Sequence, residues 1–141
     1  MGIRRRAFRL ERALTLLLDH SALQARRVHG VRLFGSEARG TASETSDLDL
    51  AVLCEPALQL DRFRLMDGLG RALSRDVDVI DLVTAPAMLA WEVLTTGRLV
   101  FEGDAIRLEE FMRRARFASE DAAQRDRMIL LAQIDDGAVP R

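Results

Sequence analysis

Residues 35–50 read Gly-Ser-Glu-Ala-Arg-Gly-Thr-Ala-Ser-Glu-Thr-Ser-Asp-Leu-Asp-Leu, and this stretch decides the fold. A short run that favours a β-strand, 31–34, precedes this stretch. The last residues of the stretch itself, 48–50, begin the largely apolar run 48–53. We therefore predict two strands, the second largely buried, joined by a small polar segment that is helical in its first half at most.

Two carboxylates stand at the start of the second predicted strand. Asp47 and Asp49 are two residues apart, so the alternation of side chains along a strand should bring both onto one face. Carboxylates held that close repel each other unless a cation lies between them. Mg²⁺ suits such a pair, because it commonly binds one or two protein carboxylates together with substrate phosphates. The competing interpretation, a pair that only caps a helix or turn, leaves both charges uncompensated.

The turn after the first strand is a candidate phosphate site. Gly35 would let the backbone approach a phosphate closely, and the Ser36 hydroxyl could donate a further hydrogen bond. Arg39, three residues further on, could reach the same phosphates through its planar guanidinium. Alternatively, Arg39 forms an ion pair with Glu37 or Glu44.

A third strand, 77–82, offers one more carboxylate. Asp78 lies in the middle of this run, and Asp81 lies three residues later, on the opposite face. Only one of the two can join Asp47 and Asp49, and the position within the strand favours Asp78. Asp81 is then expected to act as a hydrogen-bonding residue at the end of the strand. Three carboxylates beside a phosphate-binding turn are what a two-metal phosphoryl or nucleotidyl transfer site requires.

The remaining segments complete an α+β fold. Apolar residues at helical spacing predict helices over the first 25 residues and over 59–74. A further helix is predicted over 87–96 and should end at Gly97, and 98–101 is a candidate fourth strand. From residue 104 onward the chain is predicted to be helical. We expect a small mixed β-sheet with helices packed on one face and a C-terminal helical tail. The predicted organisation is a domain over 1–104 and a C-terminal helix over 105–141, which covers the core or faces a partner.

The amino-acid composition and the net charge argue against several functional classes. The 141 residues carry a net charge of −1, which argues against a general nucleic-acid binder, and no apolar run approaches the length of a membrane span. Every basic residue is arginine, so a catalytic or phosphate-binding lysine is impossible. Cys54 is alone and is interpreted as a small core residue, while His20 and His29 lack metal-ligand spacing and are expected at the surface or a helix end. These features favour a cytoplasmic protein.

The order Gly-Ser, ten further residues, Asp-x-Asp and then a separate apolar-Asp-apolar strand resembles the DNA polymerase β-type nucleotidyltransferase superfamily. The fuller form, Gly-Ser-x-Ala-Arg-Gly followed by Ser-Asp-x-Asp-Leu in so short a chain, resembles the minimal nucleotidyltransferases, which commonly pair with HEPN-domain toxins. The resemblance covers residues 30–105. It is specific, because three separated elements agree in order and spacing.

The resemblance implies both a function and a set of site residues. Members of this antitoxin family use ATP and Mg²⁺ to transfer AMP to a hydroxyl, typically of a tyrosine, on a cognate HEPN-fold RNase toxin. On the matching positions, two Mg²⁺ ions would be held by three carboxylates, of which Asp78 could also act as the general base. The residues carried over are Asp47, Asp49 and Asp78 for the metals and Gly35, Ser36, Arg39 and Gly40 for the ATP phosphates.

Two other functions stay open at this point. The chain could be an antitoxin that occludes its toxin without catalysis, or it could transfer a nucleotide to a small molecule. The second would need an additional substrate domain, for which the chain is expected to be too short. Neither a membrane nor direct sequence-specific binding of nucleic acid is expected.

Overall fold

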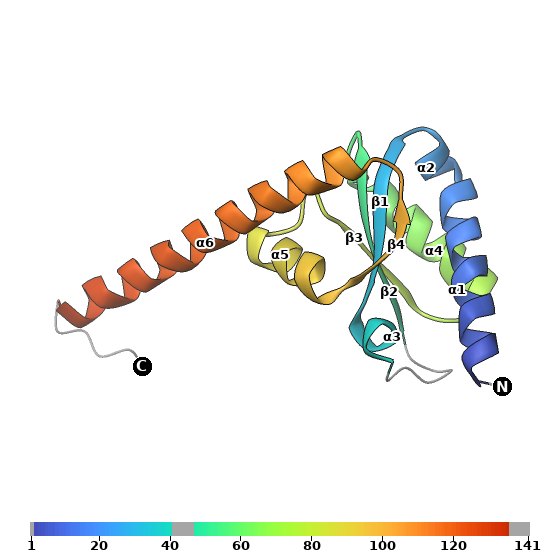
Figure 1. The fold of residues 1–141 in the computed structure, drawn as a ribbon, viewed down its shortest axis with the longest axis horizontal. Helices are drawn as coiled ribbons and strands as arrows, with labels where there is room; N and C mark the ends of the chain where they lie inside the picture. The colour runs from blue at the N-terminus through green and yellow to red at the C-terminus, as the bar shows by residue number, and fades with distance from the viewer. Residues whose placement is uncertain (1, 41–46, 136–141) are drawn as a thin grey trace.

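A computed structural model describes residues 2–40 and 47–135, with side chains described from residue 10 to 134, apart from 41–46. Six helices and four strands alternate along these residues (Figure 1). In chain order they are α1 (Gly2–Asp19), α2 (Ser21–Gln24), β1 (Arg27–Phe34), α3 (Gly35–Arg39), β2 (Leu48–Glu55), α4 (Asp61–Leu73), β3 (Val77–Asp81), α5 (Ala87–Thr96), β4 (Arg98–Glu102) and α6 (Ala105–Asp135).

The four strands form one mixed sheet in the order β3-β2-β1-β4. β1 is antiparallel to both β2 and β4, whereas β2 and β3 run parallel. The register places Phe34 opposite Asp49 and Asp49 opposite Asp78, so these three residues form one row across the sheet. The predicted mixed sheet and α+β class are confirmed.

Helices cover both faces of the sheet, not one face as the sequence suggested. One face of the sheet packs with α1, α2 and α4 in a core that includes Leu17, Leu23 and Leu65. The other face packs with α5 and α6 in a second core that includes Val93 and Leu108 (Figure 1). The reason lies in β2, whose central residues are apolar at successive positions and are therefore buried on both faces.

The start of β1 and the conformation of Gly97 differ from the prediction. β1 begins at Arg27, four residues before the predicted start, because its first residues, Arg27 and Val28, also pair with β2. α5 ends at Gly97 as predicted, although Gly97 is extended, with φ −78°, and not left-handed. A Cβ at Gly97 would lie 2.5 Å from the Val93 carbonyl oxygen, so close approach of the backbone explains the glycine.

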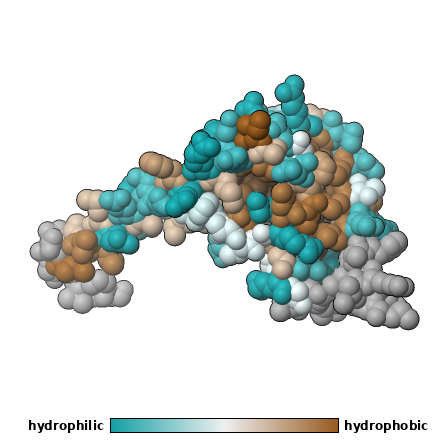
Figure 2. Space-filling model, in the orientation of Figure 1, coloured by the Kyte–Doolittle hydropathy of each residue, from teal (hydrophilic) through white to brown (hydrophobic). Residues whose placement is uncertain are grey.

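The first part of the last helix, α6, packs against the rest of the protein, and its second part extends away from it. Asp104 precedes it, and its carboxylate accepts a hydrogen bond from the Arg107 amide at 3.1 Å. Leu108 and Ala115 are buried against α5 and the sheet, while the far end is exposed at every side chain described (Figure 2). Among the residues that the structure describes, no helix has both the length and the apolar character needed to cross a membrane.

Candidate active site

The candidate site lies where β1 ends and where β2 and β3 begin. Asp49 and Asp78 occupy paired positions on adjacent parallel strands, so their side chains leave the same face of the sheet side by side. Asp47 directly precedes β2 and is exposed, as is Asp78, whereas Asp49 is half-buried. The structure therefore brings the three predicted carboxylates to one end of the sheet.

The electrostatics of Asp49 show how close these groups are. Burial raises the pKa of the Asp49 carboxyl above its usual value, and the negative charges of Asp78 and Asp47 raise it further. Arg39 and Arg75 act in the opposite direction. Asp49 thus lies among like charges whose repulsion a cation would relieve.

Gly35 holds the phosphate-binding turn against this carboxylate. Its φ of +69° is a left-handed conformation that side chains rarely adopt. A Cβ at this position would also overlap the Oδ2 atom of Asp49. Both constraints require glycine, and both place the start of α3, including Ser36, directly beside Asp49.

Gly40 ends α3 and has a structural reason of its own. It adopts a left-handed conformation, with φ +73°, and its amide donates to the Glu37 carbonyl oxygen at 3.3 Å. No atom outside its chain neighbours would lie within 4 Å of an added Cβ, so conformation and not packing explains the glycine. Its predicted contact with ATP phosphates stays a prediction.

Arg75 is a site residue that the sequence analysis did not identify. Its Nη2 atom lies 3.0 Å from Glu37 Oε1, and the two side chains are only 8% and 13% exposed. This ion pair ties α3 to the turn before β3. Glu37 thus forms its ion pair with Arg75, and not with Arg39 as the alternative interpretation of the sequence proposed. Glu44, the other proposed partner of Arg39, lies outside the residues that the structure describes.

Asp81 plays the role predicted for it at the strand end. It is 3% exposed, and its carboxylate accepts hydrogen bonds from the amides of Gln59 and Val83 and from the Thr84 hydroxyl, at 3.1, 3.2 and 3.0 Å. These bonds connect the start of α4 with the loop after β3. Asp81 is therefore committed to the fold, which leaves Asp78 as the carboxylate of β3 at the site.

The carboxylates of the site are oxygen donors of the kind that a divalent cation prefers, although in this structure they do not converge on one point. Within residues 2–40 and 47–135, no three His, Cys, Asp or Glu side chains already form a group that could hold a metal ion. Asp47 and Asp78 are exposed, so both can turn toward a cation without disturbing buried groups. Oxygen donors, mutual repulsion at Asp49 and a glycine turn open to phosphate fit Mg²⁺ bound together with a nucleotide.

Comparison with known proteins identifies the family. The sequence profile described as "Polymerase beta, Nucleotidyltransferase" matches residues 19–106, which include α3 and all four strands. The chain belongs to this nucleotidyltransferase family. The predicted superfamily is thereby confirmed.

Relatives of this nucleotidyltransferase include toxin–antitoxin proteins. It is 41% identical over 69 residues to the protein adenylyltransferase MntA of Shewanella oneidensis, a match that covers 48% of this chain and 50% of MntA. The nucleotidyltransferase thus spans about half the length of the curated relative that it matches.

Solved structures extend the likeness over most of the chain. A chain in a crystal structure of a toxin–antitoxin pair with AMP-PNP superposes with a TM-score of 0.70 at 28% identity, covering 88% of this nucleotidyltransferase and 97% of that chain. A chain in the complex of the tri-AMPylated Shewanella oneidensis HEPN toxin with the MNT antitoxin gives a TM-score of 0.70 at 25% identity, with coverages of 92% and 98%.

Proposed function

We propose that this nucleotidyltransferase is a Mg²⁺-dependent antitoxin that transfers AMP from ATP to a hydroxyl, typically of a tyrosine, on a cognate HEPN RNase toxin and thereby neutralises it. The observation that carries the proposal is the row of Asp49 and Asp78 beside the Gly35 turn. The likeness to MntA and to the AMP-PNP and tri-AMPylated toxin complexes supports the nucleotide and the partner. A cytoplasmic location is part of the proposal, and the use of ATP as substrate supports it.

The site residues divide into two roles in this proposal. Asp47, Asp49 and Asp78 would hold two Mg²⁺ ions, which when bound neutralise the charge of the triphosphate. The Gly35 backbone and the Ser36 hydroxyl would bind the β- and γ-phosphates. Arg39 would add a guanidinium at the same phosphates, where no lysine is available.

The reaction is an in-line displacement at the α-phosphorus of ATP. The acceptor hydroxyl oxygen forms the new P–O bond, the bond between the α-phosphorus and the bridging oxygen breaks, and pyrophosphate leaves. The Asp78 carboxylate lies at the exposed side of the pair and would take the hydroxyl proton. Since no covalent enzyme intermediate is needed, positioning and charge stabilisation supply the rate enhancement.

Intact-mass measurement tests this function directly. The purified chain is incubated with its HEPN partner, ATP and Mg²⁺, and the partner is expected to gain the mass of one or more AMP groups. Asp49→Asn should abolish the gain, while Asp67→Asn, an exposed carboxylate on α4, should leave it unchanged. An unmodified partner in a stable complex would contradict catalysis and favour an antitoxin that acts by occlusion.

A further inference from the structure

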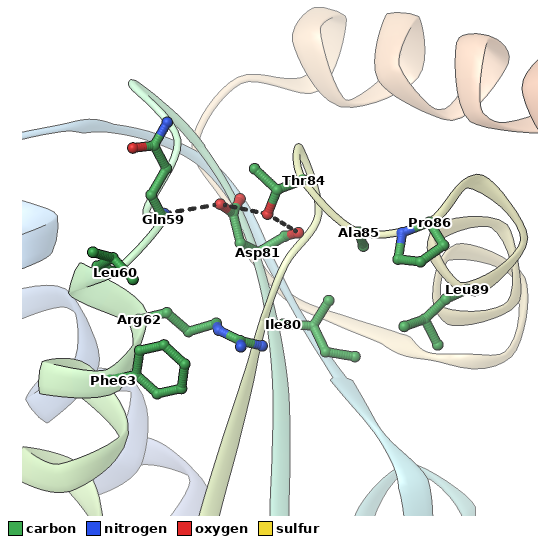
Figure 3. A pocket seen from close by; sticks show the side chains of 10 residues that line it. All are labelled: Gln59, Leu60, Arg62, Phe63, Ile80, Asp81, Thr84, Ala85, Pro86 and Leu89. Atoms are coloured by element: carbon green, nitrogen blue, oxygen red, sulfur yellow. Dashed lines mark hydrogen bonds between the residues drawn. The ribbon is translucent and has the colours of Figure 1, made fainter.

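A groove lies at the outer edge of the sheet, beside Ile80 and Asp81 at the end of β3. One wall comes from the start of α4, with Leu60 and Phe63, and the other from the start of α5, with Pro86 and Leu89 (Figure 3). Ile80 of β3 lies between the two walls, and the groove encloses about 460 Å³. Leu60 is 79% exposed, Phe63 53% and Leu89 37%, so both walls present apolar surface to solvent.

The floor of this groove is an open strand edge. β3 is the outermost strand of the sheet and pairs only with β2 among the strands described. The Asp76 carbonyl oxygen and the Leu82 amide bond to β2, at 2.9 and 3.0 Å. Because backbone groups alternate in direction along a strand, the amides of the odd-numbered residues of β3 point away from β2, at the open edge of the sheet.

One outward-facing carbonyl group of β3 accepts a hydrogen bond from a side chain that a bound strand could displace. Arg62 Nη1 donates to the Val79 carbonyl oxygen at 3.4 Å, which is long for such a bond, and its guanidinium lies 4.8 Å from the centre of the Phe63 ring. The Arg62 side chain therefore occupies the place where an added strand would donate. An incoming backbone amide would replace this bond with a shorter one.

The groove lies one strand repeat along β3 from the reacting centre of the proposed function. Asp78 and Ile80 are two residues apart on β3, about 7 Å along the strand. Both side chains leave the same face of the sheet. A polypeptide lying on the edge of β3 would thus deliver a hydroxyl to Asp78 without further folding.

We propose that the edge of β3 and its apolar groove bind the segment of the protein substrate that flanks the acceptor hydroxyl, as an added β-strand with apolar side chains between Phe63 and Leu89. This inference rests on the proposed function, since it identifies how that site takes a protein acceptor. Main-chain hydrogen bonds would supply affinity, and the walls would select the side chains. The lining residues of the groove include one cation, Arg62, and one anion, Asp81, so the groove offers a polyanion no excess of positive charge.

Amide hydrogen exchange tests the added strand without any need for catalysis. In the complex with the HEPN partner, measured without ATP, the amides of Val77, Val79 and Asp81 should exchange at least tenfold more slowly than in the free chain. The amides of Asp78 and Ile80 already face β2 and serve as the internal control. Unchanged exchange at the odd-numbered amides in a saturated complex would overturn the proposal.

A matched pair of variants tests the apolar walls. Leu60→Glu places a charge in the groove, and Ile106→Glu places one at the similarly exposed start of α6, where Ile106 is 71% exposed. Both substitutions put an acidic residue at the start of a helix, so their effects on folding should match. Leu60→Glu is expected to raise the KM for the partner about tenfold with the KM for ATP unchanged, and Ile106→Glu to change neither.

The outcomes separate this inference from the proposed function. Equal partner KM for both variants, with AMP transfer intact, would reject the groove and leave the transferase standing. Slowed exchange in β3 without AMP transfer would support the groove and reject the transferase. Loss of partner binding in both variants would place docking elsewhere and would also overturn the groove.

Discussion

Asp49→Asn should stabilise the metal-free protein while it abolishes AMP transfer. Asp49 is half-buried beside the carboxylates of Asp78 and Asp47, and its pKa is raised first by burial and then by those charges. A raised pKa in the folded state means that folding favours the protonated form. The ionised Asp49 therefore lowers the free energy of unfolding at neutral pH, and an amide removes that cost.

The geometry sets the size of this effect. Asp49 and Asp78 lie opposite each other on strands about 5 Å apart, and two unit charges at that separation repel by about 1 kcal/mol in water and about 3 kcal/mol at an effective dielectric constant of 20. Asp78 is exposed, and Arg39 and Arg75 offset part of the repulsion, so we expect a gain of about 1 kcal/mol. For a chain of this length the melting temperature should rise by about 4 °C.

Thermal unfolding in EDTA at pH 7 measures the gain, with Asp67→Asn as the control. Asp67 pairs with Arg71 on the surface of α4, so its loss should lower stability by no more than about 0.5 kcal/mol. The advantage of Asp49→Asn should shrink as the pH falls, because the native carboxyl, with its raised pKa, takes up a proton before an unperturbed aspartate does. Added Mg²⁺ with ATP should reverse the order of stability at pH 7. A variant less stable than the native chain in EDTA would refute the reasoning.

Three further outcomes follow from the same site and core. Gly35→Ala should lower the free energy of unfolding by about 2 kcal/mol in urea titration and abolish AMP transfer, because φ is +69° and the new Cβ overlaps the Asp49 carboxylate. Arg75→Gln should cost about 2 kcal/mol and raise the KM for ATP, since it leaves Glu37 buried without its cation; steady-state kinetics unaffected by the change would contradict a link to α3. Cys54 is fully buried with its pKa raised to about 11, so iodoacetamide at pH 8 should label it only after unfolding, and labelling of the native chain would count against this packing.

Local sequence information was sufficient for the strands and for the carboxylates that they carry. The apolar run of β2 and the alternation around Asp78 are short-range patterns, and each determines its own element. The sequence offered Asp78 as a third carboxylate on the condition that its strand neighbours β2, and the register that places Asp49 opposite Asp78 comes from the structure. Asp81 was assigned correctly by the same alternation.

Features that depend on distant contacts could not be predicted in this way. The ion pair between Arg75 and Glu37 joins residues 38 positions apart, and no spacing rule connects them. His29 is 6% exposed and lies 2.9 Å from Glu55, so the expected surface or helix-end position is wrong, because β1 extends further back than its apolar run.

Arginine supplies both of the cations that act on Asp49, in a chain without lysine. Arg39 on α3 and Arg75 in the turn before β3 act on Asp49, so two guanidinium groups on separate elements offset part of the repulsion at this carboxylate. A guanidinium stays charged at any physiological pH and holds a planar geometry, whereas a lysine buried here could lose its proton. Because Arg75 is also tied to Glu37, binding of phosphate at α3 and binding of a cation at Asp49 involve the same ion pair. Nucleotide and metal should therefore bind cooperatively, each lowering the apparent dissociation constant of the other by the same factor.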